Sequence, residues 1–241
     1  MPRIVFIQPL FTNKELDRNV KTVYPIGLGY LAAYVPEHWE VRIIDEEALD
    51  LASKAGCGAM FVGFESVNPD SLKDMNKKLN LKYGVESYNR LVENAQRRKI
   101  LIVGEMIVGT DSDDEQVLEK TEQFLDTINF DILRLQIMQP LPGTKLFDRL
   151  AQEERLDLKD FPEDWRKLAD EFTMGVHYQP KNLDRKTLQR WVKRVGTKFY
   201  SPWRIIKRAW KCFLYTLSPR MALTIIVMSF KSRKTYVNAK V

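Results

Sequence analysis

The stretch Ala59-Met60-Phe61-Val62-Gly63-Phe64-Glu65 decides the fold, because a regular alternation of strands and helices begins there. Its short apolar run predicts a buried strand. The runs Ile100–Val108 and Asp131–Met138 predict two more strands, and Tyr88–Arg98 and Asp114–Thr127 predict the helices between them. This β-α-β-α-β order indicates parallel strands with right-handed crossovers, and therefore an α/β fold.

A second, shorter α/β pattern precedes this one. Arg3–Pro9 and Glu40–Asp45 predict strands, and Tyr24–Tyr34 predicts a helix that Pro25 opens, since proline is tolerated in a first helical turn. Together they form a βαβ unit, which is marginal alone. The sheet that this unit begins is not completed nearby, because the chain passes through Asp50–Ala55 straight into the second series.

The C-terminal part is predicted to be helical and is strongly basic. Pro140–Thr144 predicts a turn into a helix at Lys145–Glu153, and Leu183–Tyr200 and Pro202–Leu217 carry apolar residues at helical spacing. From residue 185 onward the chain has 15 Lys/Arg and no Asp/Glu, which leaves 23 Lys/Arg against 32 Asp/Glu before it. A basic tail on an acidic body predicts an anionic partner, which is membrane lipid, nucleic acid or the body itself. The alternative is a solvated basic helix pair.

Composition limits the possible metal chemistry and location. The chain has two cysteines, Cys57 and Cys212, which are too few for a disulfide framework and favour a reducing, cytoplasmic compartment. Two thiolates are also too few for a four-iron cluster, and two histidines exclude a His-rich metal site. For Cys57 a buried inert thiol is favoured. The apolar run Met221–Met228 is far shorter than the roughly 20 residues of a transmembrane helix.

Three stretches resemble the B12-binding-domain-containing radical S-adenosylmethionine (SAM) proteins of the hopanoid type. Tyr24–Leu49 resembles the start of their cobalamin-binding domain, Ala55–Gly143 the later half of their barrel, and residues from about Asp164 to Trp210 their helical C-terminal extension. The motifs that carry the resemblance are Pro25-Ile26-Gly27-Leu28-Gly29-Tyr30-Leu31-Ala32, Gly63-Phe64-Glu65-Ser66, Asn68-Pro69, Met75-Asn76-Lys77, Pro140–Thr144 and Tyr200-Ser201-Pro202-Trp203-Arg204.

The resemblance implies a domain order and a set of cofactors. Residues 1–50 would be a partial cobalamin-binding βαβ unit of Rossmann-like type, 51–155 part of a radical SAM barrel, and 156–241 a basic helical extension. Family members use SAM, a four-iron cluster and cobalamin to methylate or oxidise lipid- or tetrapyrrole-like substrates. The CxxxCxxC loop that holds the cluster is absent here. We therefore expect an internally truncated, inactive form, with the junction between about Glu47 and Ala55.

The resemblance also implies which residues contact SAM, although no catalytic residue or metal ligand emerges. Glu65 ends a strand and can accept two ribose hydroxyl hydrogen bonds; alternatively, backbone N–H groups satisfy it. For Lys77 the alternative is a surface lysine. Glu105–Gly109 falls where the family often has a GxIxG strand, with Glu105 in place of the first glycine, and the alternative is strand core. For Pro142-Gly143-Thr144, which resembles the family's turn after its last barrel strand, the alternative is a plain turn. The residues with an implied SAM contact are Gly63, Glu65, Ser66, Lys77, Gly109 and Pro142.

Two functions from different classes remain open. The first is a truncated cobalamin-dependent radical SAM enzyme, and the second is a non-catalytic remnant that acts as a membrane-associated binding module. Trp203, Ile206, Trp210 and Phe213 share one side of a helix beside Lys/Arg, which predicts peripheral contact with an anionic membrane or packing on the body. Nucleic-acid binding is least favoured, because no RNA-module motif is present. An incomplete barrel also predicts low solubility or oligomerisation through open sheet edges, unless the N-terminal βαβ unit docks onto the open sheet and replaces the missing strands.

Overall fold

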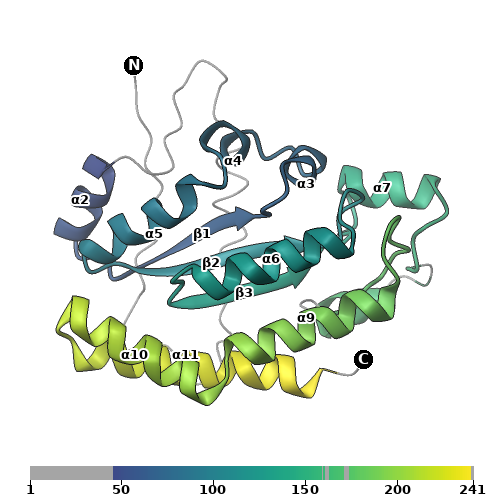
Figure 1. Cartoon of the computed structure of the whole chain (residues 1–241). Helices are drawn as coiled ribbons and strands as arrows, with labels where there is room; N and C mark the ends of the chain where they lie inside the picture. The colour runs from purple at the N-terminus through teal and green to yellow at the C-terminus, as the bar shows by residue number, and fades with distance from the viewer. Residues whose placement is uncertain (1–45, 159, 161–162, 171–173, 240–241) are drawn as a thin grey trace.

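The computed structural model describes residues 46–158, 160, 163–170 and 174–239. The βαβ unit predicted within residues 1–45 lies outside the described residues. The described part is a mixed α/β structure in which one small parallel sheet is flanked by helices (Figure 1). Among the described helices, none combines the length and the apolar character needed to cross a membrane.

The sheet contains the three strands that the sequence predicts, β1 (Ala59–Glu65), β2 (Leu101–Val108) and β3 (Ile132–Ile137). They are parallel and lie in the order β1-β2-β3. The register places Gly63, Glu105 and Arg134 side by side across the three strands. Because side chains alternate along a strand, these positions share one face of the sheet near the carboxyl ends of the strands.

The other face packs against α5 (Ser87–Arg97) and α6 (Glu115–Thr127), the two helices predicted between the strands. Asp114 caps α6 by accepting a hydrogen bond from the Val117 N–H, as expected of an N-cap aspartate. The core here is aromatic, and a side chain at Gly104 would collide with the Phe130 ring. The interlocking rings are Phe64, Tyr88, Phe124 and Phe130.

The C-terminal region forms three helices, α9 (Arg185–Phe199), α10 (Pro202–Thr216) and α11 (Pro219–Asn238), that lie along the β3 side of the sheet (Figure 1). The Tyr200 hydroxyl accepts from the Leu133 N–H at 2.9 Å and donates to the Leu133 carbonyl at 2.6 Å. The Tyr236 hydroxyl does the same at Leu135, at 3.1 Å in both directions. Two tyrosines thus hydrogen-bond to the edge of β3 where a fourth strand would otherwise pair.

Several described helices were not assigned from the sequence. The predicted helix after the Pro140–Thr144 turn is present as α7 (Lys145–Gln152), but three short helices before it were not predicted. One of them, α2, occupies the segment in which a junction was expected, and it packs on α5 through Leu49 and Ala52. The three short helices are α2 (Glu46–Lys54), α3 (Pro69–Asp74) and α4 (Lys78–Tyr83). The helices α8 (Glu163–Asp170) and α11 lie in the stretch that was expected to be helical, although no bounds were predicted for them.

Candidate functional site

The carboxyl end of β1 departs from regular strand geometry at Glu65. The pairing register with β2 shifts between Gly63 and Glu65, which makes a bulge, and Glu65 has a φ of 65°. Left-handed backbone at a non-glycine residue costs on the order of 1–3 kcal/mol and occurs often at ligand sites. A Cβ at Gly63 would collide with the Glu65 carboxylate. Gly63 therefore makes the room into which the Glu65 side chain folds.

Lys77 meets the carboxylate of Glu65. Its Nζ lies 2.7 Å from Glu65 Oε1, and the two side chains are 38% and 12% exposed. The turn between α3 and α4 holds Lys77 in place, because its N–H donates to the Leu72 carbonyl at 2.8 Å. The structure therefore joins two of the residues with an implied SAM contact in one ion pair.

A second ion pair lies on the same face of the sheet. Arg134 Nη1 on β3 is 2.7 Å from Glu105 Oε1 on β2. Burial raises the pKa of Glu105, Arg134 counteracts this, and the nearby Glu65 carboxylate raises it further. Sequence reasoning treated Glu105 only as a departure from a glycine motif. Side chains alternate between the two faces along a strand, and this alternation is the signal that could have placed Glu105 of β2 and Arg134 of β3 on one face of the sheet.

The loop that follows β2 is fixed by the buried carboxylate of Asp113. This carboxylate accepts hydrogen bonds from the N–H groups of Gly109 at 2.7 Å and Thr110 at 2.9 Å, and from the Ser71 hydroxyl at 2.5 Å. Gly109 has a φ of 95°, and its carbonyl accepts a hydrogen bond from the Tyr178 hydroxyl at 2.5 Å. Gly109 thus allows the left-handed backbone conformation that the loop after β2 requires, and it has this role without contacting a ligand through a side chain.

A pocket of about 380 Å³ lies beside this loop, at the carboxyl ends of β2 and β3. Its wall includes Lys77, Thr110, Gln136 and Gln139. Gln139 donates to the Gly175 carbonyl at 2.8 Å, while its buried Oε1 has no hydrogen-bond partner within the described residues. A buried acceptor without a partner is unusual and suits a pocket that receives a donor from a ligand.

The remaining residues with an implied SAM contact are placed differently. Ser66 is 3% exposed, and its hydroxyl accepts a hydrogen bond from the Asn68 N–H at 3.0 Å. Pro142 is exposed in the turn before α7, and the pocket is lined by its neighbour Leu141 instead. Of the residues with an implied SAM contact, the structure therefore brings Gly63, Glu65 and Lys77 together, while Gly109 shapes the loop after β2 and Ser66 stabilises the backbone after Glu65.

The described cysteines are unsuited to hold a metal. Cys57 and Cys212 are both buried, and burial raises the pKa of each thiol, which disfavours the thiolate that metals bind. This agrees with the buried thiol favoured for Cys57. Within residues 46–158, 160, 163–170 and 174–239, no group of three or more His, Cys, Asp or Glu is arranged to hold a metal ion.

Comparisons with known proteins give consistent matches. A family profile described as a domain of unknown function, DUF4070, matches residues 144–234, which include α9, α10 and most of α11. Bacteriochlorophyllide d C-12(1)-methyltransferase of Chlorobaculum tepidum is 33% identical over 163 residues, which are 67% of this chain and 33% of that protein. Hopanoid C-2 methylase of Rhodopseudomonas palustris is 33% identical over 110 residues, which are 46% of this chain and 20% of that protein.

A third relative is bacteriochlorophyllide d C-8(2)-methyltransferase of Chlorobaculum tepidum, 25% identical over 142 residues, which are 58% of this chain and 30% of that protein. The chain thus spans a third or less of the length of these curated relatives. The chain belongs to the B12-binding radical SAM family.

Proposed function

We propose that this chain is a truncated form of a cobalamin-dependent radical SAM enzyme that methylates or oxidises a lipid- or tetrapyrrole-like substrate. In this proposal the chain keeps part of the SAM site and lacks the means to start radical chemistry. The observation that carries it is the Glu65–Lys77 pair, set in a backbone bulge against Gly63 at the carboxyl end of a parallel strand. Ligands of parallel α/β folds bind at that end of the strands.

The proposal includes a division of the chain. Residues 1–50 correspond to a partial cobalamin-binding unit, 51–155 to the later half of the barrel, and 156–241 to the helical extension. The three parallel strands with α5 and α6 on one face have the arrangement of a barrel segment, in which helices cover the outside. The half-exposed ion pairs of the opposite face would then line the barrel interior.

The fit to each cofactor differs. Glu65 can accept hydrogen bonds from ribose hydroxyls, Lys77 can donate to the carboxylate of the methionyl part, and Gly63 leaves space for close approach. The four-iron cluster does not fit, because the chain offers two thiols, both buried, where three thiolates are needed. The stretch with the cobalamin resemblance lies mostly outside the described residues, and we assign no residue to cobalamin.

Isothermal titration calorimetry with SAM tests the retained site. We expect wild type to bind and Glu65→Gln to bind on the order of tenfold more weakly, because hydrogen bonds to a charged group contribute about 1.5–3 kcal/mol. Asp70→Asn is the matched control, since Asp70 pairs with Lys73 at 2.8 Å on the exposed side of α3. Absence of heat with wild type, or equal affinity in Glu65→Gln, would refute the proposal.

A further inference from the structure

The outer surface of the α10–α11 hairpin is unusually apolar. Among the described residues, nine of the twelve large hydrophobic side chains that are exposed lie between residues 202 and 238. They are Trp203, Ile206, Trp210, Leu214, Leu217, Leu223, Val227, Phe230 and Val237. Contiguous exposed apolar patches are rare on proteins that have no partner, so this surface indicates an interaction site. We call these nine residues the hairpin patch.

The spacing shows that the hairpin patch is a second apolar face and not the edge of the core. On α10 the core face is Ile205, Ala209, Cys212 and Thr216, all buried. Trp203, Ile206 and Trp210 recur at three and four positions on another side of the same helix, where Trp203 is 74% exposed. Among the described residues, none covers this stripe in the way that the alternative of packing on the body requires.

The basic residues of the C-terminal region divide into two groups. Arg194, Lys198 and Arg204 form ion pairs with Glu122 and Asp126 on α6, which ties α9 and the start of α10 to the acidic body. A second group is exposed on the hairpin and has no ion pair with the described residues. This group is Lys207, Lys211, Arg220, Lys231 and Lys234.

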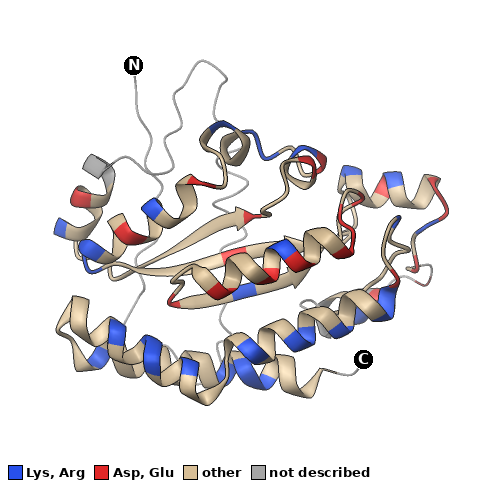
Figure 2. Ribbon diagram, in the orientation of Figure 1, with Lys and Arg blue, Asp and Glu red and all other residues tan. Residues whose placement is uncertain are grey.

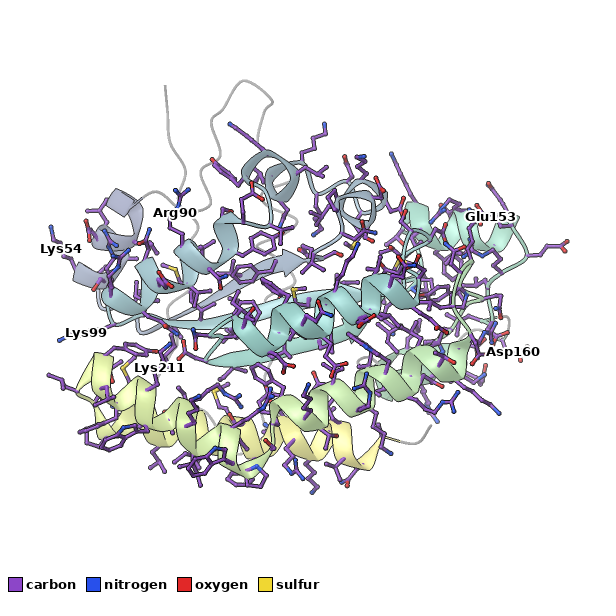
Figure 3. All side chains as sticks on the ribbon, in the orientation of Figure 1. Lys54, Arg90, Lys99, Glu153, Asp160 and Lys211 are labelled. Atoms are coloured by element: carbon purple, nitrogen blue, oxygen red, sulfur yellow. The ribbon has the colours of Figure 1, made fainter. Side chains whose placement is uncertain are left out.

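Figure 2 shows blue and no red along α9, α10 and α11, and the sequence has no Asp or Glu after Asp184. Lys211 lies on α10 at the surface of the hairpin (Figure 3). Exposed cations without an ion pair to the described residues therefore share the hairpin with the hairpin patch. Apolar side chains bordered by Lys and Arg are the pattern of helices that lie in the headgroup region of a membrane.

We propose that the α10–α11 hairpin binds the surface of an anionic lipid bilayer, with the hairpin patch in the headgroup region and the second group of cations on the lipid phosphates and carboxylates. A second copy of the chain would bring like-charged basic faces together. Residues 1–45 carry five Lys/Arg and five Asp/Glu, so they offer no complementary charge. Duplex nucleic acid would satisfy the cations but leave the indole and aliphatic groups in water, because its bases are stacked in the helix.

Co-sedimentation of the full chain with vesicles tests this inference. We expect binding to vesicles of phosphatidylserine and phosphatidylcholine, loss of binding as salt rises, and little binding to phosphatidylcholine alone. Emission from Trp203 and Trp210 should shift to the blue with anionic vesicles. Absence of pelleting at low salt, or equal pelleting with neutral vesicles, would overturn the proposal.

Two variants with matched controls assign the binding to the hairpin. Trp203→Ser with Trp210→Ser should weaken partitioning at least roughly tenfold, whereas Leu51→Ser with Tyr83→Ser, exposed on α2 and α4, should not. The removal of three charges by Lys207→Gln, Lys211→Gln and Lys231→Gln should weaken it about a hundredfold, at about 1 kcal/mol for each charge.

The control for the charge variant is Lys54→Gln, Lys82→Gln and Arg90→Gln, which removes the same charge from other exposed positions. Lys54 and Arg90 lie on the α2 and α5 side of the molecule (Figure 3). Thermal unfolding should be unchanged in every variant, since all the residues are exposed. Equal loss in the control, retention of vesicle binding in both hairpin variants, or competition by duplex DNA with no effect of the tryptophan variant would overturn the proposal.

Discussion

The two edges of the sheet end in different ways. At the β3 edge, Tyr200 and Tyr236 place one hydroxyl each on the backbone of Leu133 and Leu135. At the β1 edge, Met60–Val62 receive no hydrogen bond on the outer side from any described residue. The residues that follow the α/β part therefore supply hydrogen bonds to the outer side of β3. The outer side of β1 has no such partner among the described residues and could pair with another strand.

The largest effect should come from opening the closed edge. Tyr200→Phe with Tyr236→Phe removes two buried hydroxyls and leaves two N–H and two C=O groups without partners. Each unsatisfied site costs about 1–3 kcal/mol, so we expect the double variant to lose about 4 kcal/mol of unfolding free energy in urea. Tyr83→Phe, exposed on α4, is the control. A loss below about 1 kcal/mol would show that the hydroxyls do not hold the edge.

An intermediate effect should come from the acidic residue that joins the loop after β2 to the C-terminal part. Asp111 pairs with Arg149 at 2.5 Å and Arg155 at 2.6 Å. Burial opposes its charge, yet the hydrogen bonds from these arginines lower the pKa of Asp111 to about 2. Its folded pKa lies below the unfolded value of about 3.9, so its contribution is complete above pH 4 and is lost as pH falls toward 2.

The expected loss from Asp111 is about 2 kcal/mol, which acid titration of the unfolding free energy measures. Asp111→Asn should be less stable than wild type at pH 6 and should lack this part of the acid dependence. The same pH profile in both proteins would mean that other carboxylates cause it.

The smallest effect concerns the open edge. Phe61 on β1 is 38% exposed, and open edges with apolar residues favour association. We propose self-association through this edge and expect Phe61→Lys to weaken it about tenfold, or about 1.4 kcal/mol, in sedimentation equilibrium. Lys is a residue that natural edge strands use against pairing. A wild type that is monomeric at high concentration would contradict the proposal.

Local pattern was sufficient for the elements with clear periodicity. The three strands, α5, α6, α7, α9 and α10 agree with their predicted bounds to within two residues, because each has a clear apolar periodicity, and α6, α7, α9 and α10 also begin at a capping side chain or a proline. The helix α11 contains the β-branched run Thr224–Val227, which obscures its period, and α3 and α4 are only six residues long. Their formation depends on packing that a short window does not contain.

The candidate site was harder to predict from the sequence than the fold. Glu65 and Lys77 were singled out by resemblance, and nothing in the local sequence indicated the bulge or the left-handed backbone of Glu65. The Glu105–Arg134 pair joins residues 29 positions apart and follows only once the strand register is known. The tyrosine contacts span 67 and 101 positions, beyond any local pattern.

The span of 101 residues between Leu135 and Tyr236 also sets a delay during protein synthesis. At about 5–20 residues per second, a ribosome needs about 5–20 s after Leu135 to add Tyr236. During that interval the β3 edge of the nascent sheet lacks the two tyrosine hydroxyls that hydrogen-bond to it in the folded chain, and it is exposed to the wrong partners that an unpaired edge attracts. A stall placed between α10 and α11 should therefore increase aggregation of nascent chains more than a stall placed after Tyr236 has left the exit tunnel.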